Sequence, residues 1–197
     1  MLNDLSPWPN FLIIGASKGG TTTLQYVLEK HPDVFMCPEK ETGFFWAYGE
    51  DLSFEDPGSK MLSRRLVCSA DAYVKLFKKV RGEKAVGEAS VLYLPDSRTP
   101  NKIKELVPGM RLIVILRHPV ERAYSSFLHN RRDGIEDCKE FVVAIREEQK
   151  GQRENWLTGR YLNRSFYYEA IERYLKIFPK NQLFIGLLLF WRREVRV

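Results

Sequence analysis

The sequence has few of the residues that build metal centres or disulfide frameworks. Its 197 residues include three cysteines and three histidines. No two cysteines have C-x-x-C spacing, and no two histidines have H-x-x-x-H spacing. We therefore expect no metal site. We also expect three reduced thiols, the usual state of cysteine in the cytosol.

Long hydrophobic segments are absent as well. The apolar run at 183–191 is too short to span a bilayer. The N-terminus has no basic region ahead of an apolar stretch, so it does not look like a secretory signal. These absences predict a cytoplasmic protein without a transmembrane segment.

Positive charge is in excess but is not concentrated in one stretch. The net charge is +6, and the basic residues are dispersed along the chain. A nucleic-acid-binding protein more often has a basic stripe or a known module, and neither is apparent. We expect no nucleic-acid partner, although the charge suits an anionic ligand.

The pattern of apolar residues predicts an α/β fold with a largely parallel sheet. Hydrophobic residues make up 44% and charged residues 28% of the chain, as in a soluble globular domain. The length suits one domain, residues 1–197. Short apolar runs alternate with stretches of helical spacing, which is the order of a parallel sheet with crossover helices. The expected strands are 11–14, 34–37, 85–88, 111–116 and 182–189.

The most distinctive stretch is a strand, a glycine-rich turn and the start of a helix. Phe11–Ile14 is apolar, Gly15–Gly20 forms the turn, and Thr21–Thr23 open the helical segment. Backbone N–H groups in such a turn, together with the positive end of a helix, bind anions. In the nucleotide-triphosphate pattern G-x-x-x-x-G-K-[ST], a lysine follows the second glycine. Here Thr21 has that position and Lys18 lies inside the loop, which disfavours a magnesium–nucleotide site.

A second candidate anion site follows the strand 111–116. Arg117 stands at the carboxyl end of this strand, where ligands bind in open α/β sheets. Ser125 lies about two helical turns further on. The fork of an arginine suits a phosphate, but Arg117 and Arg122 could equally be partners in ion pairs at a helix end.

Two anion sites on one sheet suggest a ligand with phosphate groups at both ends. A nucleotide with a 5′-phosphoryl group and a 3′-phosphate fits this description. A magnesium-dependent phosphotransferase usually has an aspartate at the end of a buried strand, and residues 112–116 offer none.

These segments, in this order, resemble sulfotransferases that use 3′-phosphoadenylyl sulfate (PAPS). The resemblance is closest to the heparan-sulfate-type branch and its bacterial relatives, and it covers roughly residues 9–182. It rests on four segments: Gly15–Thr23, Lys40–Phe45, Gly87–Ser90 and Arg117–Ser125. The resemblance implies a P-loop-like three-layer fold, with helices on both faces of the sheet.

The resemblance also assigns roles to residues. It implies that the first loop, through Lys18, Gly19, Gly20, Thr21, Thr22 and Thr23, binds the 5′-phosphosulfate. Arg117 and Ser125 then bind the 3′-phosphate, Glu41 is the general base, and no metal is needed. A lysine inside the loop could stabilise charge on the leaving phosphate, and a carboxylate could deprotonate the acceptor. Glu88 is the alternative base; it could instead orient Lys18 or be a buried carboxylate bound by backbone amides.

The sequence departs from the family at its C-terminus. Related domains continue past the last strand, so the resemblance predicts that the C-terminal part is missing or divergent. The apolar run Leu187–Trp191 would then be exposed. Two alternatives to an active enzyme stay open: a weakly active or inactive nucleotide-binding or interaction module of the same fold, and a P-loop kinase. The acceptor could be an anionic glycan or a small hydroxyl-bearing metabolite, and the sequence does not indicate an oligomeric state.

Overall fold

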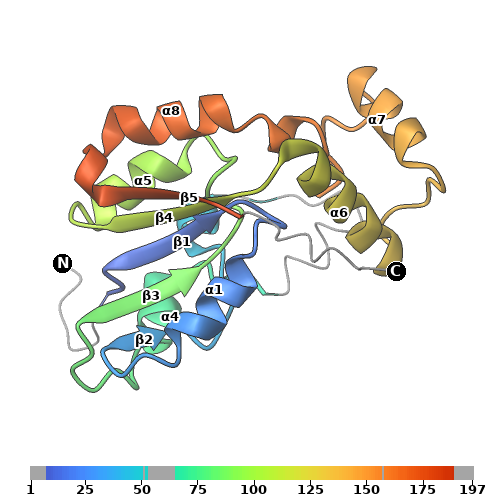
Figure 1. Cartoon of the computed structure of the whole chain (residues 1–197). Coiled ribbons are helices and arrows are strands. Elements are labelled where there is room, and N and C mark those ends of the chain that lie inside the picture. The colour runs from blue at the N-terminus through green and yellow to red at the C-terminus, as the bar shows by residue number, and fades with distance from the viewer. Residues whose placement is uncertain (1–7, 51, 53–64, 157, 189–197) are drawn as a thin grey trace.

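A central sheet of five parallel strands organises the protein (Figure 1). The computed structural model describes residues 8–50, 52, 65–156 and 158–188. The strand order is β2-β3-β1-β4-β5, and all four pairings are parallel. The predicted α/β fold is thereby confirmed. The strands are β1 (Phe11–Gly15), β2 (Val34–Met36), β3 (Ala85–Ala89), β4 (Arg111–Leu116) and β5 (Leu183–Leu187).

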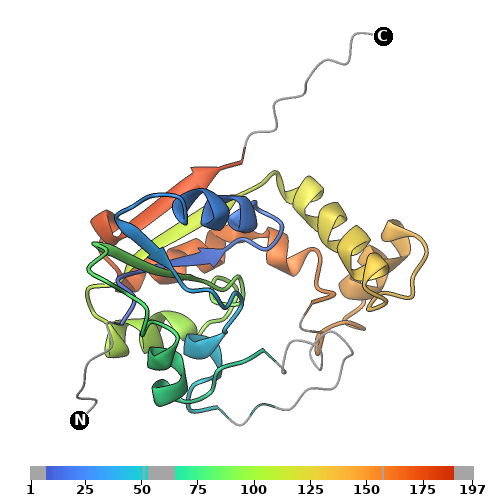
Figure 2. The same cartoon turned by 90° about the horizontal axis from the view of Figure 1, so that it is seen from below.

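Helices cover both faces of the sheet, which gives the expected three layers (Figures 1 and 2). Alternate residues of β1 point to opposite faces. Leu12 and Ile14 pack in the large core with α2, α4, α5 and α8, whereas Phe11 and Ile13 pack with Leu24 of α1. The helices are α1 (Thr21–Leu28), α2 (Phe44–Ala47), α4 (Ala70–Lys75), α5 (Thr99–Leu106), α6 (Pro119–Arg132), α7 (Phe141–Gln149) and α8 (Tyr167–Ile177), with single turns η1 (Asn163–Ser165) and η2 (Lys180–Gln182).

Local sequence explains where several of these elements begin. Ser69 caps α4, because its hydroxyl accepts a hydrogen bond from the N–H of Ala72. α6 has Pro119 in its first turn, where the missing N–H costs nothing. The segment 38–46, which the sequence predicts to be a loop, ends in the single helical turn α2, which extends to Ala47. The aromatic side chains of the segment are buried in the main core.

Helices α6 and α7 form a lobe beyond the carboxyl ends of the strands (Figure 2). A small apolar cluster that includes Phe127 and Tyr161 holds the lobe together. Beside it, the buried guanidinium of Arg153 forms an ion pair with the buried carboxylate of Glu136. Glu136 also accepts hydrogen bonds from the hydroxyl of Tyr161 and the N–H of Cys138.

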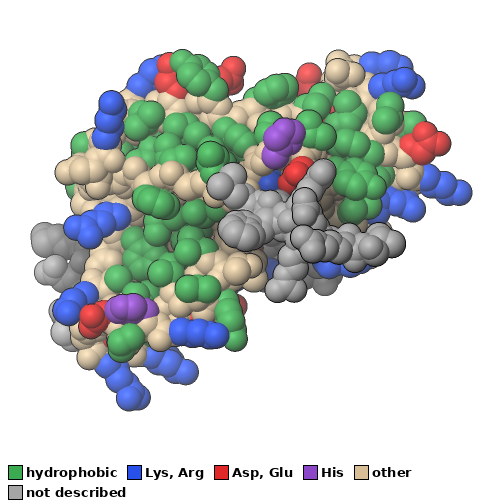
Figure 3. Space-filling model, viewed as in Figure 1, with side chains coloured by type: hydrophobic (Ala, Val, Ile, Leu, Met, Phe, Trp, Pro, Cys, Tyr) green, Lys and Arg blue, Asp and Glu red, His purple; other side chains and the backbone are tan. Residues whose placement is uncertain are grey.

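Large apolar side chains are exposed on α1 and β5. Figure 3 shows hydrophobic side chains gathered over this face of the molecule. Tyr26 and Val27 on α1 are exposed, as are Phe184 and Leu187 on β5. Leu187 begins the run that the sequence predicts to be exposed, and 69% of it is accessible. The rest of that run, after Leu188, lies outside the described residues, as does most of 47–68.

The buried ion pair should matter more to stability than an exposed one. Replacing Glu136 leaves the buried charge of Arg153 with the partly exposed Glu147 as its remaining carboxylate partner, and therefore without full compensation. We predict that Glu136→Gln lowers the free energy of unfolding by about 3 kcal/mol in urea denaturation. The matched change Asp33→Asn removes a carboxylate from an exposed pair with Lys84 and should cost less than about 1 kcal/mol. Equal losses for the two variants would contradict the prediction.

Candidate active site

A groove of about 1020 Å³ opens at the carboxyl ends of the strands. Residues from distant parts of the chain meet there, among them the turn after β1, the segment 40–41, the segment after β3, and Arg117 with the helix α6 that follows it. With the exception of Gly19, every site residue expected from the sequence lines this groove: Lys18, Gly20, Thr21, Thr22, Thr23, Glu41, Arg117 and Ser125.

The turn after β1 is held against β4. The N–H of Ala16 donates to the carbonyl oxygen of Ile115 at 2.9 Å, and the N–H of Gly19 donates to the carbonyl of Ala16. A β-carbon on Gly19 would lie 2.3 Å from the Ile115 oxygen, so only glycine fits. Gly19 therefore serves close packing of the turn, while its neighbours Lys18 and Gly20 line the groove.

The order of the strands explains why the two expected anion sites converge. After β1 the chain crosses to β2 on one side of the sheet, and after β4 it crosses to β5 on the other. Ligands of open α/β sheets bind at such a reversal. β1 and β4 are neighbours, so the turn with Lys18 and the residue Arg117 after β4 come out side by side.

Arg117 has an intramolecular partner as well as a position in the groove. Its Nε donates to Glu121 at 3.2 Å, so the helix-end ion pair considered from the sequence is present. The side chain of Glu121 is half exposed. Arg122, by contrast, does not line the groove; it is fully buried and donates to the hydroxyl of Ser165 and the carbonyl of Tyr161.

The groove is strongly basic. Six of its lining residues are lysine or arginine, and two are aspartate or glutamate. The pKa of Lys18 is lowered, first by burial and then by the charge of Arg132, with smaller contributions from Arg117 and Lys40; Asp133 opposes the shift. This crowding of cations around Lys18 would favour a bound anion.

Glu41 lines the same groove and has a constrained backbone. Its φ of 61° is in the left-handed region, and its N–H donates to the carbonyl of Ala89. The N–H of Val91 donates to its carboxylate at 2.9 Å, and Lys40 Nζ lies 4.0 Å from it. Burial raises the pKa of Glu41, and the Val91 N–H, Lys40 and Arg164 oppose the rise. The group is thus a carboxylate suited to accept a proton.

Glu88, the alternative base, is fully buried and is not among the residues lining the groove. Four hydroxyl groups donate to its carboxylate, from Thr42, Ser90, Tyr73 and Tyr93. The sequence-based suggestion that backbone amides satisfy it is therefore wrong, because hydroxyls do so. Burial raises the pKa of Glu88 to about 7.

Some groove residues were not found by sequence reasoning. Lys40 donates to the hydroxyl of Thr22 and so connects the turn to the Glu41 segment. His129, Arg132 and Asp133 lie at the end of α6, where Asp133 accepts from Arg132 and His129 Nδ1 lies 3.6 Å from Asp133. The sequence predicts His129 to be an exposed helix residue, whereas the structure shows it lining the groove. His129 follows Ser125 by four residues, so both lie on the same face of one helix, and this spacing could have indicated that His129 reaches the site.

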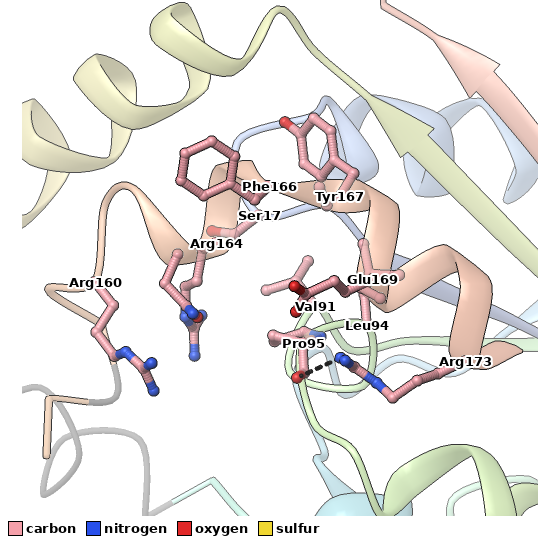
Figure 4. Close-up of a pocket in the computed structure, with 13 residues that line it drawn as sticks. Ser17, Val91, Leu94, Pro95, Arg160, Arg164, Phe166, Tyr167, Glu169 and Arg173 are labelled. Carbon is pink, nitrogen blue, oxygen red and sulfur yellow. Dashed lines mark hydrogen bonds between the residues drawn. The ribbon is translucent and has the colours of Figure 1, made fainter. Parts of the chain in front are cut away.

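A smaller pocket of about 190 Å³ adjoins the groove (Figure 4). The two share Ser17, Val91 and Arg164. Figure 4 shows Arg160 and Arg164 side by side on one wall, while Arg173 donates to the carbonyl of Pro95 on the other. Because Val91 also binds Glu41, this pocket reaches the groove next to that carboxylate.

Two absences concern the described residues only. Among residues 8–50, 52, 65–156 and 158–188, no three histidine, cysteine, aspartate or glutamate side chains are grouped as metal ligands would be. Within the same ranges, no helix is long and apolar enough to cross a bilayer.

Comparison with known proteins identifies the family. The sequence profile of the sulfotransferase domain matches residues 9–186, so the chain belongs to the sulfotransferase-domain family. A crystal structure of a sulfotransferase from Alicyclobacillus acidocaldarius is 35% identical, with a TM-score of 0.84 over 92% of this chain and 73% of that one. The sulfotransferase domain of the Synechococcus PCC 7002 olefin synthase is 17% identical with a TM-score of 0.52, which supports the fold alone.

The curated relatives are much longer proteins. The human bifunctional heparan sulfate N-deacetylase/N-sulfotransferase 2 is 26% identical over 90% of this chain, which covers 19% of that protein. The membrane-associated sulfotransferase kil1 of Dictyostelium discoideum is 30% identical over 60% of this chain and 22% of its own length. The chain thus spans about a fifth of these relatives.

The buried carboxylate predicts a specific dependence of stability on pH. Folded Glu88 keeps its proton up to about pH 7, whereas an unfolded glutamate loses it near 4.5. Unfolding therefore releases a proton between these values, and this contribution to stability falls as the pH rises. We predict that the stability of the wild type relative to Glu88→Gln falls by about 3 kcal/mol between pH 4.5 and 7 and is constant above.

The control for this experiment is Glu105→Gln, at an exposed position of α5. Its stability should follow the wild-type pH dependence. Chemical denaturation at a series of pH values measures all three proteins. A pH-independent difference between the wild type and Glu88→Gln would contradict the assigned environment of Glu88.

Proposed function

We propose that the protein transfers a sulfuryl group from PAPS to a hydroxyl or amine acceptor. The observation that carries the proposal is the cluster of cations around Lys18, at the point where the turn after β1 meets the end of β4. A ligand with phosphate groups at both ends would balance this charge. The matched domain, residues 9–186, is the proposed catalytic unit, in line with one domain over residues 1–197.

The residues of the groove fit the two ends of such a donor. The turn Lys18–Thr23, with backbone N–H groups and three hydroxyls at the start of α1, would hold the 5′-phosphosulfate. Arg117 and Ser125 would hold the 3′-phosphate. The two binding regions lie along one groove, which is what a ligand charged at both ends requires.

Lys18 would stabilise the leaving phosphate. As the S–O bond to the donor phosphate breaks, negative charge grows on the bridging oxygen, and the ammonium group of Lys18 would neutralise it. A fixed cation of this kind contributes about 10²–10³ in rate. Burial and the neighbouring cations lower the pKa of Lys18, and the negative charge of a bound donor would oppose that shift and favour the ammonium form.

Glu41 would be the general base. Its carboxylate is 17% exposed, borders the groove, and has a raised pKa. It would take the proton of the acceptor as the acceptor oxygen or nitrogen attacks sulfur, and this assistance is worth about 10²–10⁴ in rate. Glu88 is the weaker candidate for this role, because a fully buried carboxylate cannot reach an acceptor.

The acceptor would approach Glu41 through the pocket of Figure 4. Arg160 and Arg164 there would favour an acceptor that carries negative charge, such as an anionic glycan. Several relatives are heparan sulfate N-deacetylase/N-sulfotransferases, which supports a glycan as the acceptor. A small hydroxyl-bearing metabolite is the other candidate, and a cytoplasmic location stays a prediction.

Binding of 3′,5′-adenosine bisphosphate tests the donor site without an acceptor. We predict that calorimetry detects binding to the wild type. Arg117→Ala should weaken bisphosphate binding about 10- to 100-fold and 5′-AMP binding much less, because the arginine would bind the 3′-phosphate. Arg111→Ala, at the exposed opposite end of β4, is the control and should bind as the wild type does.

The competing readings give different results in the same assay. A P-loop kinase would bind ATP in a magnesium-dependent way and prefer it to the bisphosphate. A binding module without activity would bind the bisphosphate but transfer no sulfate. No bisphosphate binding at millimolar concentration would contradict the proposed donor.

Turnover tests the two catalytic roles. With [³⁵S]PAPS and a panel that includes N-desulfated heparan sulfate and 4-nitrophenol, Lys18→Met should lower kcat about 10²–10³-fold. Glu41→Gln should lower it about 10²–10⁴-fold. Lys75→Met, at an exposed position of α4, is the control. Full turnover by either active-site variant would remove that residue from the mechanism.

The wild-type pH profile should have two limbs. The rate should rise as Glu41 loses its proton, at a pH above the ordinary glutamate value of 4.5. It should fall as Lys18 loses its proton, at a pH below the ordinary lysine value of 10.5. Glu41→Gln should abolish the acid limb of the residual rate and keep the basic one.

A further inference from the structure

Glu88 stands at the end of β3 as a buried acceptor of hydroxyl hydrogen bonds. None of its side chain is accessible. The hydroxyls of Thr42 and Ser90 donate to one carboxylate oxygen, and those of Tyr73 and Tyr93 donate to the other. A buried carboxylate is costly without such partners. Its presence therefore calls for an explanation beyond packing.

Two of the four donors are linked to the segment that carries Glu41: Thr42 belongs to it, and Ser90 is hydrogen-bonded to it. Thr42 follows Glu41 in the chain, and its oxygen lies 3.0 Å from Glu88. Ser90 precedes Val91, whose N–H donates to the carboxylate of Glu41. The hydroxyl oxygen of Ser90 also accepts the N–H of Gly43 at 3.0 Å. Glu88 is thus connected to the Glu41 segment in two ways, once through Thr42 and once through Ser90.

The carboxylate of Glu88 decides whether the hydroxyls of Thr42 and Ser90 donate to it or accept from it. An ionised or partly ionised carboxylate mainly accepts, so it draws the hydroxyl hydrogens of Thr42 and Ser90 toward itself. Their lone pairs are then free to accept the N–H groups of Phe44 and Gly43. An amide at position 88 would present N–H donors to the same hydroxyls and disturb this arrangement.

The segment needs this support because its backbone is strained. Glu41, which is not a glycine, has a φ of 61°. A residue other than glycine in this region costs about 1–2 kcal/mol, so neighbouring contacts must hold it there. The hydroxyls that bind Glu88 connect this segment to β3 and to the segment after β3.

We propose that Glu88 is a positioning residue that holds the carboxylate of Glu41 toward the acceptor, through Thr42 and Ser90. The proposal rests on the proposed role of Glu41 as general base. It differs from the two roles considered from the sequence, in which Glu88 is itself the base or orients Lys18. A displacement of about 1 Å in a reacting group can lower a rate about 100-fold.

A double-mutant cycle tests the proposal. Glu88→Gln should lower kcat about 10- to 100-fold, measured with [³⁵S]PAPS and the acceptor of the panel above that the wild type uses. The dissociation constant of 3′,5′-adenosine bisphosphate should stay within about twofold, because the donor site is not involved. In a Glu41→Gln background, Glu88→Gln should lower kcat no further, since it acts through Glu41.

A second pair of variants keeps the test decisive if Glu88→Gln folds poorly. Ser90→Ala and Tyr73→Phe each remove one hydroxyl from Glu88, but only Ser90 also binds the Glu41 segment. Ser90→Ala should lower kcat, and Tyr73→Phe should leave kcat unchanged even if it lowers the melting temperature. Equal effects of the two on kcat would overturn the proposal.

The outcomes separate this inference from the proposed function. If Glu41→Gln loses turnover but Glu88→Gln does not, or if the two losses multiply, Glu88 does not position Glu41 and the proposed function stands. If Glu41→Gln keeps full turnover, the base is wrongly assigned and this inference falls with it. The same holds if the wild type consumes no PAPS with any acceptor of the panel.

Discussion

The close approach of Gly19 to the carbonyl oxygen of Ile115 is the constraint on which the site depends. It leaves no room for a side chain, and with the hydrogen bond from Ala16 it fixes the turn after β1 against β4. Arg117 follows two residues after Ile115. Lys18 and Arg117 therefore line the same groove as a consequence of the pairing of β1 with β4.

This arrangement concentrates positive charge in the groove, where six lysine and arginine residues face two acidic residues. Arg132, Arg117 and Lys40 all disfavour the charged form of Lys18, and burial adds to their effect. Glu41 and Asp133 are the acidic residues that line the groove. A folded protein tolerates such repulsion at a functional site because a bound anion relieves it. The pairing of β1 with β4 thus brings cations together, and this positive charge favours an anionic ligand.

Sequence reasoning could predict the features that local pattern encodes. The strand–turn–helix at 11–30 and the strand 111–116 have clear periodicity. The sequence predicts a candidate anion site directly after each of these two strands. The residues at the end of α6 could not be found in this way. His129 and Arg132 line the groove because of how α6 is placed relative to the sheet, which local sequence does not specify. The hydroxyl environment of Glu88 likewise joins α4, the Glu41 segment and β3, which no local pattern connects.

The central claim is that one groove binds a nucleotide by phosphate groups at both ends. A crystal structure of the protein with 3′,5′-adenosine bisphosphate tests it most directly. The account predicts the 5′-phosphate on the turn Lys18–Thr23 and the 3′-phosphate beside Arg117 and Ser125. A bisphosphate bound in the smaller pocket beside Arg160, or with its 3′-phosphate away from Arg117, would contradict it.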